Sequence, residues 1–74
     1  MNDILCKVKN AIQNISHGET NRQMCIKDIA DYLPDISVED ISKALYDLEK
    51  EGFIRVLDEI SYHGVKTINM FTLS

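Results

Sequence analysis

The chain has 74 residues and a formal net charge of −4 at pH 7, with 45% hydrophobic and 27% charged residues. This length supports one domain, and we expect residues 1–74 to form it, near the lower limit at which a core is stable without cross-links. No apolar stretch approaches the ~20 residues that a membrane-spanning helix needs, and the start of the chain lacks the pattern of a secretion signal. We therefore expect a cytoplasmic protein that makes no contact with a membrane.

The residues that usually carry metal or covalent chemistry are few and scattered. Cys6 and Cys25 are the two cysteines, and in a chain without an export signal we expect both to be reduced and buried as small apolar side chains. Together with His17 and His63 they lack the close pairs of a structural zinc site. Glycine-rich phosphate loops and nucleophile motifs are absent as well. The sequence therefore predicts a protein that is not an enzyme and binds neither metal nor cofactor.

Two helices are predicted in the first half of the chain, where apolar residues recur at helical spacing. The first is expected from about Asp3 to Ser16, ended by Gly18 in a left-handed conformation. The segment from Met24 to Ile26 is expected to form a short extended piece. The second helix is expected from Ile26 to Leu33, because Pro34 cannot continue the backbone hydrogen-bond ladder.

The third helix has the clearest signals of beginning and end. Ser37 followed by Asp40 resembles a capping box, with Asp in place of the usual Glu or Gln. Gly52 is placed as the C-terminal stop. Between them, from about Val38 to Glu51, one apolar stripe is expected to be buried; it consists of Ile41, Ala44, Leu45 and Leu48.

Two strands are predicted after the third helix. Phe53 to Leu57 and Val65 to Leu73 are rich in β-branched and aromatic residues, and the polar stretch Asp58 to Gly64 between them predicts a long hairpin loop. The expected fold is therefore α+β: a winged helix-turn-helix of three helices followed by a two-stranded antiparallel wing, with a short first strand near Met24 to Ile26. Folds of this shape usually bind nucleic acid.

The outward face of the third helix determines the functional expectation. A rotation of about 100° per residue places five polar residues opposite the apolar stripe: Glu39, Ser42, Lys43, Tyr46 and Lys50. Lys43 and Lys50 can approach phosphates or base edges, and Ser42 can donate to a phosphate. An outward Tyr46 is expected to contact a partner, another protomer or the wing, because exposed aromatic residues favour interfaces. Lys66 in the wing is expected to add a phosphate contact.

Acidic residues lie beside the same face. They are Asp40, Asp47, Glu49 and Glu51 on the third helix, and Asp58 and Glu59 offset the charge of the wing. Each carboxylate held near a phosphate costs about 1 kcal/mol at partly solvated distances, reduced by salt. We therefore expect double-stranded DNA to be bound weakly by a monomer, and binding to need a homodimer or a larger DNA-binding protein.

Two alternative interpretations of these charges stay open. The charges can form a solvated helix surface with same-helix ion pairs, of which Glu39–Lys43 has the favourable order. The chain can also be an acidic protein-interaction module that does not bind DNA by itself, because carboxylates that repel phosphate attract basic surfaces on other proteins.

From Met24 to Thr72 the sequence resembles the winged-helix superfamily of small transcription regulators. The run Ile26 to Leu33 and the spaced apolar residues between Val38 and Ile54 carry the resemblance. Among short members, the chain is most similar to the stand-alone regulators of bacterial fimbrial operons. The resemblance implies a DNA-binding transcription regulator whose recognition helix runs from about Val38 to Glu51.

A narrower resemblance concerns the segment Ser42 to Leu48, which is similar to the recognition helix of winged domains that bind left-handed Z-form nucleic acid. Tyr46 matches the tyrosine that packs on a base in that family, and Ser42 stands where the family has a phosphate-contacting Asn. The Pro-Pro-x-Trp wing of that family is absent, and residues 68–71 occupy the comparable strand.

Overall fold

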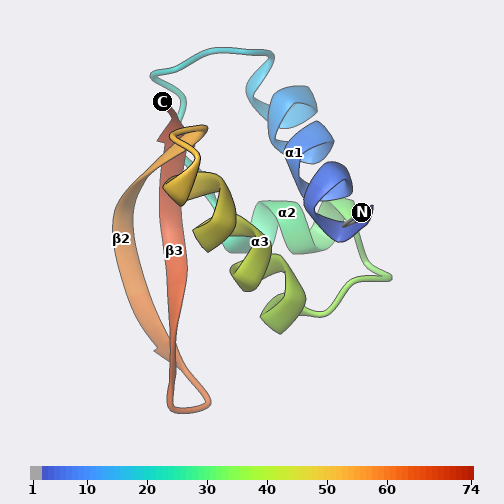
Figure 1. Cartoon of the computed structure of the whole chain (residues 1–74), viewed down its shortest axis with the longest axis vertical. Helices are drawn as coiled ribbons and strands as arrows, with labels where there is room; N and C mark the ends of the chain where they lie inside the picture. The colour runs from blue at the N-terminus through green and yellow to red at the C-terminus, as the bar shows by residue number, and fades with distance from the viewer. Residues whose placement is uncertain (1–2) are drawn as a thin grey trace.

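The computed structural model describes residues 3–74, except for the side chain of Tyr62. Within these residues the chain forms three helices and three strands (Figure 1): α1 Asp3–Ser16, β1 Met24–Cys25, α2 Ile26–Tyr32, α3 Val38–Lys50, β2 Ile54–Tyr62 and β3 Val65–Leu73. The strands form one antiparallel sheet in the order β1-β3-β2. The predicted α+β class, the three helices, the hairpin and the short first strand are thus confirmed.

The helices and the sheet enclose one core. In Figure 1, α3 crosses the front of the molecule between α1 and the strands, and α2 lies behind it. Fully buried residues come from every helix and from the central strand: Val8, Ile12, Ile29, Ile41, Leu45, Leu48, Ile68 and Phe71. The apolar stripe predicted for the third helix is confirmed, because each of its members is at most 2% exposed. Across residues 3–74, no helix has the length and apolar character to cross a membrane.

The two ends of α3 follow from local chemistry. At its start, the Ser37 hydroxyl accepts a hydrogen bond from the backbone N–H of Asp40 at 3.2 Å, as expected of an N-cap. At its end, Gly52 has a φ of +80°, and its N–H donates to the carbonyl of Glu49. The N–H of Phe53 donates to the carbonyl of Leu48 at 2.9 Å, which completes a Schellman motif. These contacts fix where α3 ends and where the chain turns into β2.

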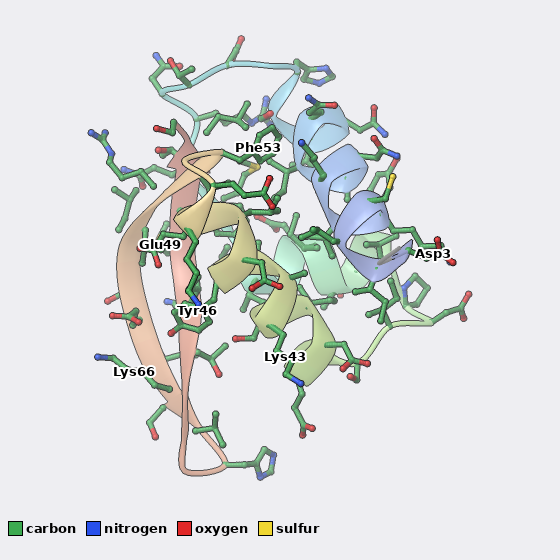
Figure 2. All side chains as sticks on the ribbon, in the orientation of Figure 1. Asp3, Lys43, Tyr46, Glu49, Phe53 and Lys66 are labelled. Atoms are coloured by element: carbon green, nitrogen blue, oxygen red, sulfur yellow. The ribbon has the colours of Figure 1, made fainter. Side chains whose placement is uncertain are left out.

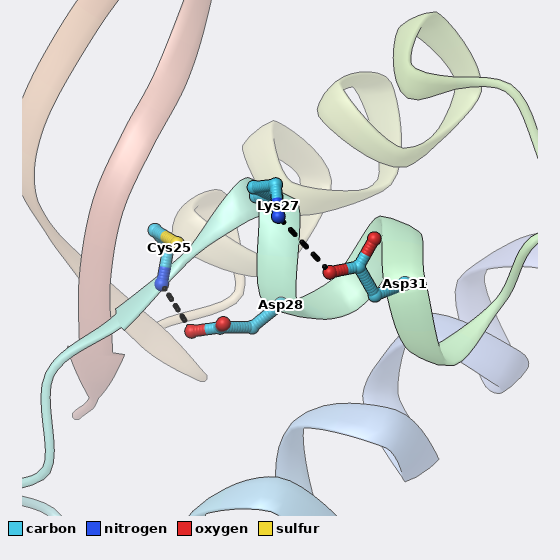
Figure 3. A network of polar contacts seen from close by, with 4 residues as sticks. All are labelled: Cys25, Lys27, Asp28 and Asp31. Atoms are coloured by element: carbon cyan, nitrogen blue, oxygen red, sulfur yellow. Dashed lines mark hydrogen bonds and ion pairs between the residues drawn. The ribbon is translucent and has the colours of Figure 1, made fainter.

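The charged residues of α2 make two local contacts, one at the start of the helix and one along its exposed side. The backbone N–H of Cys25, the residue before α2, donates to Asp28 Oδ2 at 3.1 Å (Figure 3). One turn further, Lys27 Nζ lies 3.4 Å from Asp31 Oδ2, and both side chains are exposed. The first contact satisfies one of the backbone groups next to the helix start. The second pair is an exposed i, i+4 contact of small energetic weight.

The connection between β2 and β3 differs from the prediction. A polar loop was expected from Asp58 to Gly64, but β2 continues to Tyr62, so the turn contains only His63 and Gly64. Their φ angles of 52° and 79° match a type I′ turn, whose twist suits a hairpin. The expectation is wrong because polar residues are compatible with a strand whose side chains face solvent. Backbone pairing between β2 and β3 continues to Tyr62.

The cysteines are both free, and their surroundings correct one expectation. Cys6 on α1 is exposed, so the prediction that it is buried is wrong. It lies on the side of α1 away from the buried residues Val8, Ala11 and Ile12. Cys25 is half-buried where β1 meets α2. Among the side chains of the described residues, no cluster of three His, Cys, Asp or Glu groups is placed to hold a metal ion.

Candidate nucleic-acid interface

A groove separates α3 from the β2–β3 hairpin, with a volume of about 430 Å³. Its walls are Val38, Glu39, Asp40, Ser42, Lys43 and Tyr46 from the α3 side, and His63, Val65, Lys66 and Thr67 from the hairpin. We call it the α3–hairpin groove. It brings together four of the five residues predicted to contact nucleic acid, namely Ser42, Lys43, Tyr46 and Lys66. The fifth, Lys50, is exposed on the last turn of α3 and does not line the groove.

Ser42 is not on the outward face of α3. Only 7% of its surface is exposed, so the prediction of an outward hydroxyl is wrong. Ser42 follows the core residue Ile41, and the hairpin runs beside this flank of α3, where Thr67 lines the same groove. A helix that packs against elements on two sides buries more of its circumference than one apolar stripe indicates. The hydroxyl of Ser42 is therefore poorly placed to reach a phosphate.

Lys43 has the position that the sequence predicts. Its side chain is exposed at the groove, on the first half of α3 (Figure 2). The alternative that Glu39 and Lys43 form a same-helix ion pair is not realised among the described contacts, since the two ion pairs found within residues 3–74 involve Lys27 and Lys66. The ammonium group of Lys43 therefore remains available to an anion in solution.

Tyr46 is half-buried, and its contact is with the hairpin. Its hydroxyl donates to Glu59 Oε2 on β2 at 2.7 Å. This hydrogen bond is the main reason why the pKa of Tyr46 is raised to about 12; burial and the negative charges of Glu59 and Glu49 raise it further. Of the three kinds of contact expected for this tyrosine, the structure shows the one with the hairpin.

Lys66 is held by the same carboxylate. Its Nζ lies 3.6 Å from Glu59 Oε1, and 75% of the lysine side chain is exposed. In Figure 2 the Lys66 side chain extends toward β2 and away from Lys43. Glu59 thus joins α3, β2 and β3 through one side chain. We refer to Tyr46, Glu59 and Lys66 as the Glu59 triad.

Glu59 faces α3 because of an irregularity in the sheet. Ile54 points into the core, and in a regular strand residue 59, an odd number of positions later, would face the opposite side. The register shifts on both sides of Asp58, between Val56 and Glu59. Such a bulge moves the following side chains to the other face. Asn69 Nδ2 donates to Asp58 Oδ2 at 2.9 Å across this irregular part.

The sequence interpretation treated Glu59 only as a charge that offsets the wing. Its role as the common partner of Tyr46 and Lys66 was missed, because the expected loop began at Asp58 and left Glu59 outside the sheet. The sequence carries no signal for the β-bulge, so it did not predict that Glu59 lies on the face of β2 that meets α3. The acidic residues of α3 lie as expected at exposed positions: Glu39, Asp40, Asp47 and Glu49, followed by Glu51 at the C-cap.

Comparison with known proteins gives no assignment. No model of a protein family matches the chain, and no curated protein matches it either. The geometry and charge of the α3–hairpin groove are therefore the features that indicate a function.

Proposed function

We propose that this chain is a small DNA-binding transcriptional regulator with a winged helix-turn-helix fold. In this proposal α3 is the recognition helix, α2 precedes it across the turn of residues 33–37, and the β2–β3 hairpin is the wing. The observation that carries the proposal is that Lys43 of α3 and Lys66 of the hairpin both line one open groove. Two cations on opposite walls can contact phosphates on either side of an inserted helix.

The dimensions are suitable for this mode of binding. The major groove of B-DNA is about 12 Å wide and admits one α-helix, and α3 presents 13 residues beside the projecting hairpin. Lys43 would reach a phosphate or a base edge, and Lys66 a phosphate of the flanking strand. The exposed carboxylates of α3 lower the affinity, so a second copy of the chain or a larger DNA-binding protein supplies the remaining contacts.

The direct test is binding to a fluorescently labelled random duplex, followed by anisotropy at low salt and then over a salt series. Two or three phosphate contacts give a slope of log K against log salt of about −2 to −3. Lys43→Gln should weaken binding about three- to tenfold, since it removes one cation at a phosphate. Lys7→Gln is the matched control, because Lys7 is an exposed helical lysine on α1 that does not line the groove.

Equal effects of the two lysine variants would contradict the assignment of α3 and the groove as the interface. Absence of binding at tens of micromolar duplex would contradict DNA binding by the chain alone. Lys50→Gln adds information on the last turn of α3: if its loss weakens binding as strongly as that of Lys43, the inserted surface extends beyond the groove.

A second candidate function is favoured by the acidic residues around α3. The exposed carboxylates of Glu39, Asp40, Asp47, Glu49 and Glu51 outnumber the two lysines of the same helix. Such a surface suits a protein-interaction module that attracts basic segments of a partner. Binding of an oligo-lysine peptide that is weakened by Asp47→Asn, together with no binding to duplex, would favour this function over the first.

A further inference from the structure

We propose that Glu59 is a built-in competitor of phosphate: it pairs with the ammonium group of Lys66 at the hairpin wall of the α3–hairpin groove, and a polyanion must displace it before the hairpin can contribute a cation. The inference deepens the proposed function, because it concerns the regulation of the same groove. It assigns to Glu59 an autoinhibitory role that its position in the sequence does not indicate.

The geometry shows how the carboxylate holds the lysine. Glu59 pairs across the sheet with Ile68, and Lys66 pairs with Ser61, so the two charged side chains are diagonal neighbours on one face of the hairpin. Diagonal neighbours lie within reach of long side chains, and the ammonium is 3.6 Å from Glu59 Oε1. Lys66 consequently extends over β2 rather than toward Lys43 (Figure 2).

The two contacts of Glu59 differ in strength, and this difference sets the order of events. The hydrogen bond from Tyr46 is short, at 2.7 Å, and its acceptor is an ionised oxygen, which makes it a strong contact. The ion pair with Lys66 is longer, and three quarters of the lysine side chain is exposed, so it is a weak contact. A phosphate therefore displaces Glu59 from Lys66, while the hydrogen bond from Tyr46 holds the Glu59 carboxylate in its position.

The charge near the groove changes accordingly. Glu59 neutralises Lys66. Of the two lysines that line the groove, Lys43 is then the one without an ion pair to a described residue, and the carboxylates of Glu39 and Asp40 line the groove beside it. After displacement, Lys66 supplies a second positive charge on the opposite wall. The anion must therefore compete with an internal carboxylate, which selects polyanions with closely spaced phosphates over isolated anions.

The inference predicts that removing the carboxylate improves binding. Glu59→Gln should tighten binding to a random duplex about three- to tenfold at low salt. Its salt slope should change little, since Lys66 contacts phosphate in both proteins once it has left Glu59. Asp58→Asn is the matched control: it removes the same charge from the neighbouring residue of β2, but Asp58 bonds to Asn69 and leaves the ion pair of Lys66 intact. The control should change the affinity less and leave the slope unchanged.

A purely structural role of Glu59 predicts the opposite result. If the triad only fastens the hairpin to α3, Glu59→Gln loosens the hairpin and weakens duplex binding. Weaker binding, or a gain no larger than that of Asp58→Asn, would overturn the inference. Thermal unfolding of both variants shows whether either one has lost its fold.

A second readout separates this inference from the proposed function. Inorganic pyrophosphate, added to the isotopically labelled chain, should shift the side-chain resonances of Lys66 at lower concentration in Glu59→Gln than in the wild type or in Asp58→Asn. If this occurs but neither protein binds duplex, the competition stands and the DNA-binding function fails. If pyrophosphate affects Lys66 equally in all three proteins while duplex is bound, the function stands and the competition is refuted.

Discussion

At the scale of single residues, Tyr46 is the most specific reporter of the candidate site. Its pKa is about 12 in the folded chain, against 10.0 for an ordinary tyrosine, mainly because its hydroxyl donates to the Glu59 carboxylate. The folded state therefore holds this proton more tightly than the unfolded state. The stabilising contribution is complete below pH 10 and is lost as the pH rises through about 12.

The titration of the three tyrosines can be followed by tyrosinate absorbance. Tyr46→Phe should remove the transition near pH 12, and Glu59→Gln should move that transition toward 10 because a neutral amide no longer favours the protonated phenol. Asp58→Asn, which leaves the acceptor of Tyr46 in place, should not move it. A spectrum in which Tyr46→Phe removes a transition near pH 10 would contradict the hydrogen bond.

Ser42 gives a residue-scale test of the corrected assignment. Ser42 is only 7% exposed, on the side of α3 that faces the hairpin. The variant Ser42→Ala should therefore leave duplex affinity within about twofold of the wild type. Lys43→Gln, one residue later on the exposed surface, is the comparison that should weaken binding. A loss for Ser42→Ala as large as that for Lys43→Gln would restore the original expectation that the serine contacts phosphate.

At the scale of elements, the end of α3 is set by backbone conformation. Gly52 has a φ of +80° and nothing within 4 Å of where a Cβ would be. Gly52→Ala should therefore cost about 1 kcal/mol through the left-handed conformation alone, which lowers Tm by about 4–8 °C in a domain of this size. Gly52→Asn should cost less, because Asn tolerates this conformation better. If Gly52→Ala and Gly52→Asn lower Tm by the same amount in a thermal melt, the left-handed conformation of residue 52 is not the cause of the loss.

The elements were predictable where a local rule fixes them. Apolar spacing, the Ser37 cap, Pro34 and Gly52 predicted the three helices to within one residue of their observed ends. The extent of β2 was not predictable, because Asp58, Glu59 and Ser61 are polar residues that usually signal a loop. Backbone pairing with β3 overrides this composition. Every feature that depends on the extended strand, including the Glu59 triad, was missed for the same reason.

At the scale of the whole molecule, the sequence could place Lys43 and Tyr46 on α3 but not the hairpin relative to them. Periodicity defines directions around one helix, whereas the burial of Ser42 and the partner of Tyr46 depend on how β2 and β3 pack against α3. That packing is set by the bulge near Asp58 and by the short turn at His63 and Gly64. The bulge and the turn both arise when two strands pair, so the sequence of one strand alone does not predict them.

The small core makes the whole molecule sensitive to a single cavity. A chain of 74 residues has an expected free energy of unfolding of roughly 4–11 kcal/mol, and Leu45, at 0% exposure, lies where α3 meets the rest of the core. Leu45→Ala should cost about 2–5 kcal/mol, a large share of that total, seen as a lower urea midpoint. The control Leu57→Ala makes the same chemical change on β2, where the side chain is 44% exposed, and should cost well under half as much. Comparable losses would mean that the hairpin is buried in solution, by a second copy or a partner that covers Leu57.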